Sequence, residues 1–280
     1  MSLSSLKELV EDADRQNRAV GAFSVGNMEM VIGAVRAAEE LDTPIILQIA
    51  EVRLKTSPLE YMAALMLAAA KHSTVPVAVH LDHGLNISTV ERALELGFTS
   101  VMLDASLLPY EENVKATSYI VKKAAEYGAS VEAELGVVGG NEGGGKSHII
   151  QCTDPLVAAD FCARTGIDAL AVAIGNAHGN YPVLPELRFD VLEAVNASTD
   201  TPLVLHGGTG ISPEMFVRAI GAGIRKINIA TASFDALAKG AAQYSLTADK
   251  PNYFALSEAM AQSVYLNVKK HINIFNTEQE

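Results

Sequence analysis

Short apolar runs rich in β-branched residues recur along the chain, and each is followed by a segment with helical periodicity. The apolar runs lie at 19–25, 44–50, 77–84, 98–105, 130–136, 169–175, 202–205 and 226–230. The helical segments follow at 28–41, 58–71, 88–96, 111–127, 155–166, 189–196, from 213 to 221 or 223, and from 231 onward. A repeat of about 25–35 residues is typical of parallel strands joined by helical crossovers.

Eight such units in 280 residues predict an α/β protein with a closed (β/α)8 TIM barrel, in a single domain over residues 1–280. A doubly wound open sheet is the alternative, but no Gly-x-Gly-x-x-Gly follows the first run and no linker divides the chain. Beyond the barrel we expect a first helix capped by Ser4 or Ser5, and one or two helices within 251–275.

Charge and hydropathy exclude several classes of partner. The net charge is -12, which argues against binding to nucleic acid or to an anionic membrane. The longest apolar run, at 61–70, is too short to span a bilayer, and the first residues are too polar for a signal peptide. Cys152 and Cys162 match no disulfide framework or zinc spacing. We therefore expect a cytoplasmic protein with free thiols.

Polar side chains stand where several buried strands are expected to end. His83, His178 and His206 follow the third, sixth and seventh runs, and Asp104 and Glu134 lie at or near the ends of the fourth and fifth. In a barrel these ends meet at one rim, and three imidazoles with an open fourth position are typical of catalytic zinc. A single histidine would more often be a hydrogen-bonded core residue.

The third run also carries His80 and Asp82, two positions apart, which places them on one face of the strand and His83 on the other. That alternation holds only while the strand lasts, and the chain could already be turning before Gly84.

The seventh and eighth strands end in short glycine- and threonine-rich stretches. Their members are Gly207, Gly208 and Thr209 after the seventh strand, and Asn228 and Thr231 around the end of the eighth. Backbone N–H groups at such turns, together with the start of the next helix, can hold a phosphate, and barrels bind phosphate at these two loops. Ordinary tight turns with helix caps are the alternative.

The connection from 137 to 152 is long for a compact α/β unit, and its glycines flank a single acid, Glu142. We expect a lid that carries Glu142 to the site; a disordered surface insertion is the alternative.

Four motifs together resemble the class II, zinc-dependent ketose-bisphosphate aldolases, in the branch that contains tagatose-bisphosphate aldolases. They are His-Leu-Asp-His-Gly at 80–84, Val-Glu-Ala-Glu-Leu-Gly at 131–136, Ala-Val-Ala-Ile-Gly-Asn-Ala-His-Gly at 171–179 and Leu-His-Gly-Gly-Thr-Gly at 205–210. The resemblance runs from about residue 7 to 275 and implies an aldolase that cleaves a phosphorylated ketose to dihydroxyacetone phosphate and an aldehyde. It also implies a small phosphorylated sugar as the binding partner, and we expect a homodimer or homotetramer.

The same resemblance assigns roles to individual residues. It implies zinc ligands at His83, His178 and His206, with an alternative metal position at Asp104 and Glu134. It implies Asp82 as the acid/base at the breaking bond and Glu142 as the residue for proton exchange on the dihydroxyacetone phosphate carbon. The site for dihydroxyacetone phosphate, often with a monovalent cation such as sodium, would comprise Gly179, Gly207, Thr209, Asn228 and Thr231.

The chain departs from the family pattern where the sugar binds. Ser24 replaces the usual Asn, Ala50 replaces a frequent Ser, the segment 181–185 lacks a lysine, and no Gly-Ser follows Phe275. The ketose, and the anchor of a second phosphate, therefore stay open. Arg53 and Lys55 are candidate clamps, although charged loop residues are more often only solvated.

Two other functions compete with the aldolase. A non-catalytic accessory subunit with the same fold would need neither Asp82 nor Glu142. A zinc hydrolase would be expected to carry a His-x-His strand pair, which the strand ends lack. Within the aldolase function, a Schiff-base mechanism in place of zinc would need a lysine at the rim. Lys226 is instead expected at the opposite end of the eighth strand.

Overall fold

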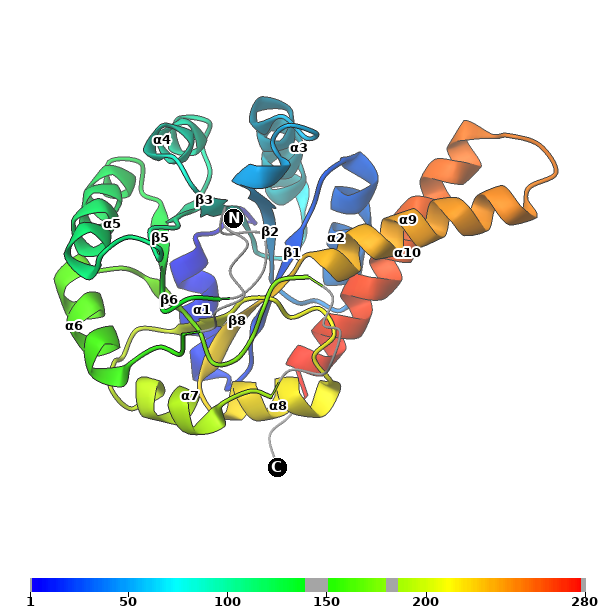
Figure 1. Cartoon of the computed structure of the whole chain (residues 1–280). Coiled ribbons are helices and arrows are strands. Elements are labelled where there is room, and N and C mark those ends of the chain that lie inside the picture. The colour runs from blue at the N-terminus through cyan, green and yellow to red at the C-terminus, as the bar shows by residue number, and fades with distance from the viewer. Residues whose placement is uncertain (1, 139–150, 180–185, 278–280) are drawn as a thin grey trace.

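The computed structural model describes residues 2–138, 151–179 and 186–277. Within these residues, eight parallel strands pair in sequence order and close into a barrel (Figure 1). The (β/α)8 prediction is confirmed. The strands are β1 (Val20–Ser24), β2 (Ile45–Ala50), β3 (Val77–Gly84), β4 (Ser100–Leu103), β5 (Ser130–Leu135), β6 (Ala169–Val172), β7 (Leu203–Leu205) and β8 (Ile224–Ile229).

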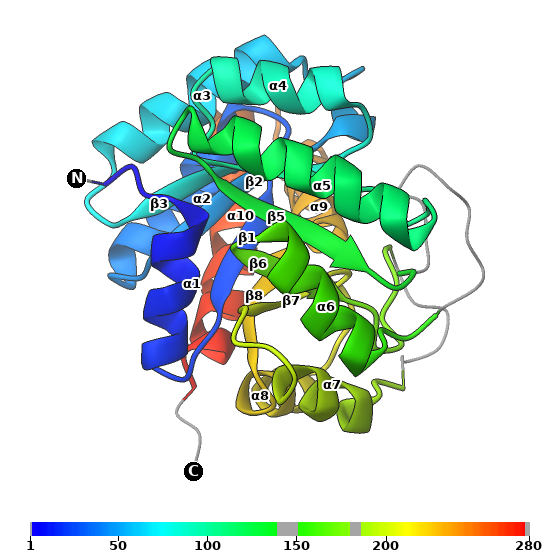
Figure 2. The same cartoon turned by 90° about the vertical axis from the view of Figure 1, so that its left-hand side faces the viewer.

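Helices surround the strands on the outside of the barrel (Figure 1, Figure 2). They are α1 (Leu6–Arg15), α2 (Met28–Glu40), α3 (Leu59–His72), α4 (Ile87–Glu95), α5 (Tyr110–Ala125), α6 (Pro155–Thr165), α7 (Phe189–Asn196), α8 (Pro213–Gly221), α9 (Thr231–Thr247) and α10 (Tyr253–Phe275), with a short 3-10 helix η1 (Glu51–Arg53). Several begin where the sequence offers a cap. Asp154 accepts hydrogen bonds from two backbone N–H groups at the start of α6, and Ser212 accepts one at the start of α8.

Helix α1 closes the amino-terminal end of the barrel. Ser5 caps it, as the sequence predicts, in a reciprocal pair of hydrogen bonds with Glu8. Its apolar face, with Leu6, Leu9 and Val10, packs on the small and branched side chains that point into the barrel from the lower strand segments. This end of the barrel is therefore filled with apolar side chains, which leaves the carboxyl end for polar chemistry.

The inward faces of the strands change character along the barrel axis. On β1 the inward series passes from Val20 and Ala22 to Ser24, and on β2 from Ile46 to Gln48. On β8, Lys226 and Asn228 are both buried and lie at adjacent inward positions. Strand β8 begins at Ile224, two residues before the predicted start, so Lys226 lies in the barrel interior and not at the far end of the strand. That expectation was wrong, because the apolar pattern understated the length of the strand.

Helices α9 and α10 form a long pair that projects beyond the barrel (Figure 1). The terminal segment is one helix of 23 residues, where the sequence allowed one or two. Its inner half packs on the barrel, and His271 lies among the rings of Phe23, Phe216 and Phe275. Despite the length of α10, no helix among the described residues is both long and apolar enough to cross a bilayer.

Gly33 lets α2 approach α10 closely. A Cβ atom at this position would lie 2.5 Å from the carbonyl oxygen of Ala261 and 2.9 Å from the backbone nitrogen of Tyr265. Helix propensity alone favours alanine over glycine by about 1 kcal/mol. We expect Gly33→Ala to lower the free energy of unfolding by about 1–3 kcal/mol, because backbone atoms would have to move apart. Chemical denaturation measures this change.

A suitable control is Ser245→Ala on the exposed face of α9, where propensity acts without close packing. That variant should stay within about 0.5 kcal/mol of the parent chain. A Gly33→Ala protein more stable than its parent would show that α10 can shift at no cost.

Candidate metal and substrate site

His83, His178 and His206 converge at the carboxyl end of the barrel from three different strands. His83 lies near the end of β3, His178 follows β6 and His206 follows β7 directly. One side-chain nitrogen from each lies within 4.8 Å of the others, and Nε2 of His83 is 3.1 Å from Nε2 of His178. The side chains of Asp104 and Glu134 form a second group of the same compactness with His83.

His83 reaches this group through an unusual backbone conformation. The alternation along β3 places its side chain on the face opposite to His80 and Asp82. The φ angle of His83 is 41°, in the left-handed region that costs a non-glycine residue about 1–2 kcal/mol. The register of β3 against β4 also shifts between Leu81 and Gly84. The strand therefore turns at His83, and the imidazole joins the barrel mouth beside Asp82.

Asp104 fixes the ring of His83. Its Oδ2 lies 2.8 Å from Nδ1 of His83, and its other oxygen accepts two hydrogen bonds from Ser106. Burial would lower the pKa of His83, but the charge of Asp82 and the bond to Asp104 outweigh it and raise the pKa to about 10. Burial would raise the pKa of Asp104, but His83 holds it at about 2. The carboxylates thus strongly favour positive charge at this point.

Glu132 fixes the ring of His206 in the same manner. Its Oε1 lies 2.7 Å from Nε2 of His206, and a carboxylate only accepts, so the imidazole donates from Nε2. In the neutral ring Nδ1 then carries the lone pair. This nitrogen is buried, lies 3.4 Å from Oε2 of Glu134 and makes no hydrogen bond within the described chain. A buried nitrogen without a hydrogen-bond partner is suited to bind a metal ion.

Asp82 lies beside the histidines with only 1% of its surface exposed. Its Oδ1 accepts a hydrogen bond from Nδ2 of Asn228 at 3.2 Å, and its Oδ2 accepts one from Nε2 of Gln48 at 3.1 Å. Gln48 in turn donates to Ser24 at 3.2 Å. Both oxygens of the carboxylate are therefore oriented by amide groups, one from β2 and one from β8.

Sequence reasoning missed the layer of side chains beneath the site. Glu132, Lys226 and His80 are fully buried, and Nζ of Lys226 lies 2.8 Å from Oε2 of Glu132. Nδ1 of His80 bonds to Ser100 at 2.8 Å, and burial together with the charge of Lys226 lowers the pKa of His80 to about 3. Alternation along each strand was the available signal, because Glu132 and Glu134 share one face of β5.

The two glycine-rich loops lie side by side and are bonded together. Gly208 donates its N–H to the carbonyl oxygen of Asn228 at 3.0 Å, and Oγ1 of Thr209 accepts from the N–H of Ala232 at 3.0 Å. Gly207 has a φ of 66°, and a Cβ there would lie 2.0 Å from the carbonyl oxygen of Ala177. The loops after β6, β7 and β8 therefore meet at one point. Thr231 is the first residue of α9 and Gly179 is the last described residue after β6.

The structure gives only part of the information needed on Glu142 and Arg53. Glu142 lies outside the described residues; the ends of its connection are bridged by hydrogen bonds between Val137 and Gln151. Arg53 lies at the same rim, exposed, with its guanidinium carbon 5.4 Å from the ring centroid of Phe234 in the first turn of α9. Arg53 is therefore close to the loop after β8.

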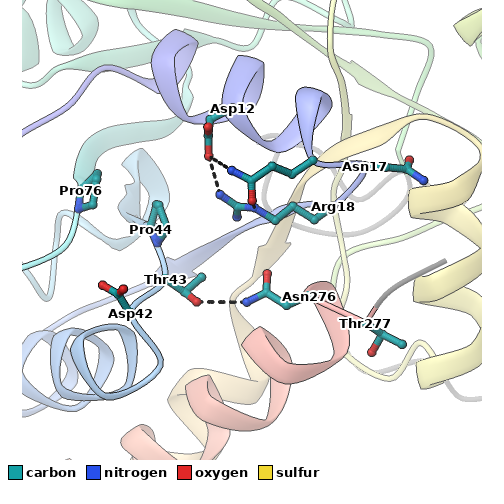
Figure 3. A pocket seen from close by; sticks show the side chains of 10 residues that line it. Asp12, Asn17, Arg18, Asp42, Thr43, Pro44, Pro76, Asn276 and Thr277 are labelled. Atoms are coloured by element: carbon teal, nitrogen blue, oxygen red, sulfur yellow. Dashed lines mark hydrogen bonds and ion pairs between the residues drawn. The ribbon is translucent and has the colours of Figure 1, made fainter.

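A hollow of about 660 Å³ lies at the opposite end of the barrel (Figure 3). Its walls come from the α1–β1 and α2–β2 connections and from the end of α10. The polar side chains that line it bond mainly to one another: Arg18 pairs with Asp12 at 2.7 Å, and Asn276 donates to Thr43 at 3.0 Å. Residues at this end of a barrel ordinarily contribute to the stability of the fold.

Comparisons with known proteins identify the family of this chain. The sequence model described as "Fructose-bisphosphate aldolase class-II" matches residues 4–280. The chain is 42% identical over 262 residues to a fructose-bisphosphate aldolase of Geobacillus stearothermophilus, covering 91% of this chain and 89% of the relative. It is 42% identical over 256 residues to one of Staphylococcus aureus strain Mu50, covering 90% and 89%.

Solved structures agree with this relationship. The crystal structure of the YdjI aldolase from Escherichia coli K12 is 35% identical, with a TM-score of 0.88 over 98% of this chain and 97% of that one. Because the sequence match spans nearly the whole chain, it includes the strand ends that carry the three histidines and Asp82. The chain therefore belongs to the class II fructose-bisphosphate aldolase family, whose members are lyases.

Proposed function

We propose that the protein is a zinc-dependent aldolase that cleaves a ketose bisphosphate, such as fructose- or tagatose-1,6-bisphosphate, into dihydroxyacetone phosphate and an aldehyde. The observation that carries this proposal is the placement of a buried carboxylate, Asp82, beside three converging imidazoles. The names of the relatives, fructose-bisphosphate aldolases, support the same reaction.

The residues present fit a zinc ion. His83 offers Nε2, because Nδ1 is bonded to Asp104, and His206 offers Nδ1, because Nε2 is bonded to Glu132. His178 supplies the third nitrogen. A zinc ion held there would act as a Lewis acid that stabilises negative charge on the oxygens of the substrate during cleavage. Asp104 and Glu134 remain the proposed alternative metal position.

Asp82 serves as the acid/base of the cleavage. When the C3–C4 bond breaks, the C4 hydroxyl loses its proton to Asp82 and becomes the aldehyde, while the electron pair stays with the three-carbon fragment. A proton delivered to C3 then completes dihydroxyacetone phosphate, and we assign that delivery to Glu142. The hydrogen bonds from Gln48 and Asn228 hold the Asp82 carboxylate in one orientation for this transfer.

The phosphate of the shared three-carbon end is proposed to bind where the loops after β6, β7 and β8 meet. Gly179, Gly207, Gly208, Thr209, Asn228 and Thr231 are the proposed residues. The N–H of Gly208 is already bonded to Asn228, so Gly208 shapes this site and does not donate to the ligand. The start of α9 adds a favourable dipole. A sodium ion here, a homodimer or homotetramer, and a cytoplasmic location remain predictions.

The zinc assignment can be tested by replacing one ligand. We expect His206→Ala to lose most of its zinc and its aldolase activity, since two imidazoles do not complete the site. Zinc per chain by elemental analysis and release of dihydroxyacetone phosphate measure the two effects. His72→Ala, an exposed histidine on α3, is the control and should change neither. Full activity of the wild-type protein after chelation and dialysis would refute the assignment.

The role of Asp82 predicts a different outcome. Asp82→Asn keeps the shape of the side chain but cannot take a proton. We expect kcat to fall by about 100-fold or more while zinc content is retained, which is the scale of a general acid/base contribution. Steady-state kinetics on zinc-loaded protein would show it. A variant with normal kcat would remove Asp82 from the chemistry.

Arg53 tests whether a second phosphate is bound at the distal end. If it grips that phosphate, Arg53→Ala should weaken transition-state binding, seen as kcat/KM, by about 1.5–3 kcal/mol. The loss should vanish with a ketose that carries only the shared phosphate. Lys55→Ala, on the same exposed segment, is the control and should have little effect. An equal loss with both substrates would instead assign Arg53 a structural role against Phe234.

A further inference from the structure

Lys226 is a buried ammonium group that takes no part in the proposed metal binding or proton transfer. It has no exposed surface, so no substrate carbonyl can contact Nζ to form a Schiff base. A buried lysine is costly unless its charge is matched, and an apolar side chain could fill the same space on β8. Nζ lies 2.6 Å from Oδ1 of Asn228 and 2.8 Å from Oε2 of Glu132. These two contacts lead to two different parts of the site.

The first contact orients Asn228. An ammonium group has three donors and no acceptor, so it must face the carbonyl oxygen of the amide. The NH2 group of Asn228 is thereby turned toward Oδ1 of Asp82, to which it donates at 3.2 Å. A flipped amide would put two donors against the ammonium and an oxygen against the carboxylate. Lys226 therefore decides that Asn228 donates to Asp82.

The second contact holds Glu132. One carboxylate oxygen pairs with Lys226, and the other accepts from Nε2 of His206 at 2.7 Å. His80, also facing Glu132 at 3.7 Å, is held neutral by burial and by Lys226. Because a carboxylate only accepts, the N–H of His206 that meets Glu132 is the one at Nε2, and Nδ1 is the nitrogen left for the metal.

We propose that Lys226 is a positioning residue that sets two features of the site from one buried group: the orientation of Asp82, through Asn228, and the tautomer of His206, through Glu132. This inference rests on the proposed function for the roles of Asp82 and His206. It explains why β8 carries a lysine and an asparagine at successive inward positions, where Lys226 contacts Glu132 and Asn228 contacts Asp82.

The test uses two variants, because Lys226→Met alone leaves the buried charge of Glu132 unmatched. The second variant combines Lys226→Met with Glu132→Gln, which removes both charges. Ile227→Val is the matched control, since this outward-facing neighbour on β8 is equally buried and touches neither Asn228 nor Glu132 through a polar group. Unfolding curves first establish that each variant folds.

In a folded variant without Lys226 we expect three changes. The zinc dissociation constant, measured by competition with a chelator, should rise about tenfold or more, the usual effect of losing a group that orients a metal ligand. At saturating zinc, kcat should fall about tenfold or more, and KM should change little. In nitrogen NMR of the zinc-loaded protein, the Nε2–H signal of His206 should shift from its wild-type position, because Glu132 is no longer held in place by Lys226. The control should match the wild type in all three.

Wild-type zinc affinity and kcat in the folded double variant would overturn the proposal, as would equal losses in Ile227→Val. Failure of both Lys226 variants to fold would also overturn it and make Lys226 a purely structural residue. A wild-type protein that binds zinc but cleaves no ketose phosphate would contradict the proposed function alone. In that case the zinc and NMR measurements still decide on Lys226.

Discussion

Four carboxylates, those of Asp82, Asp104, Glu132 and Glu134, lie in the carboxyl half of the barrel with side chains at most 3% exposed. Such groups can stay charged away from water only where cations and hydrogen-bond donors face them. Lys226 pairs with Glu132, and the carboxylates raise the pKa values of His83 and His206, so that these rings favour positive charge. The arrangement is therefore strongly favourable to a divalent cation between the histidines.

The same contacts also fix the orientation of the polar side chains around the site. Asp104 and Glu132 each hold one nitrogen of a histidine, which leaves the other nitrogen pointing into the site. Gln48 and Asn228 each hold one oxygen of Asp82. A chemical group positioned in this way pays little to reorganise during the reaction.

The two ends of the barrel divide structure from chemistry. At the amino-terminal end, α1 packs an apolar face on small and branched inward side chains. At the carboxyl end the loops after β6, β7 and β8 meet, and the first turn of α9 lies at that junction. The close contact of α2 with α10 at Gly33 fixes the projecting helix pair to the barrel wall.

The sequence by itself determined the elements and the residues at their ends. Short apolar runs and the helical period of 3.6 residues, together with caps such as Ser5 and Asp154, are local signals, so strands and helices follow from neighbours along the chain. The placement of His83, His178 and His206 at one rim of the barrel follows as soon as the strands are parallel and closed. Tertiary structure alone decided how these side chains are held. His83 joins the site through a backbone turn that alternation forbids, and Lys226 lies inside the barrel because β8 starts earlier than its apolar run. The pairing of Lys226 with Glu132 depends on the stagger of strands that are about 90 residues apart in sequence. No local pattern encodes that stagger, because it is set by how all eight strands close together.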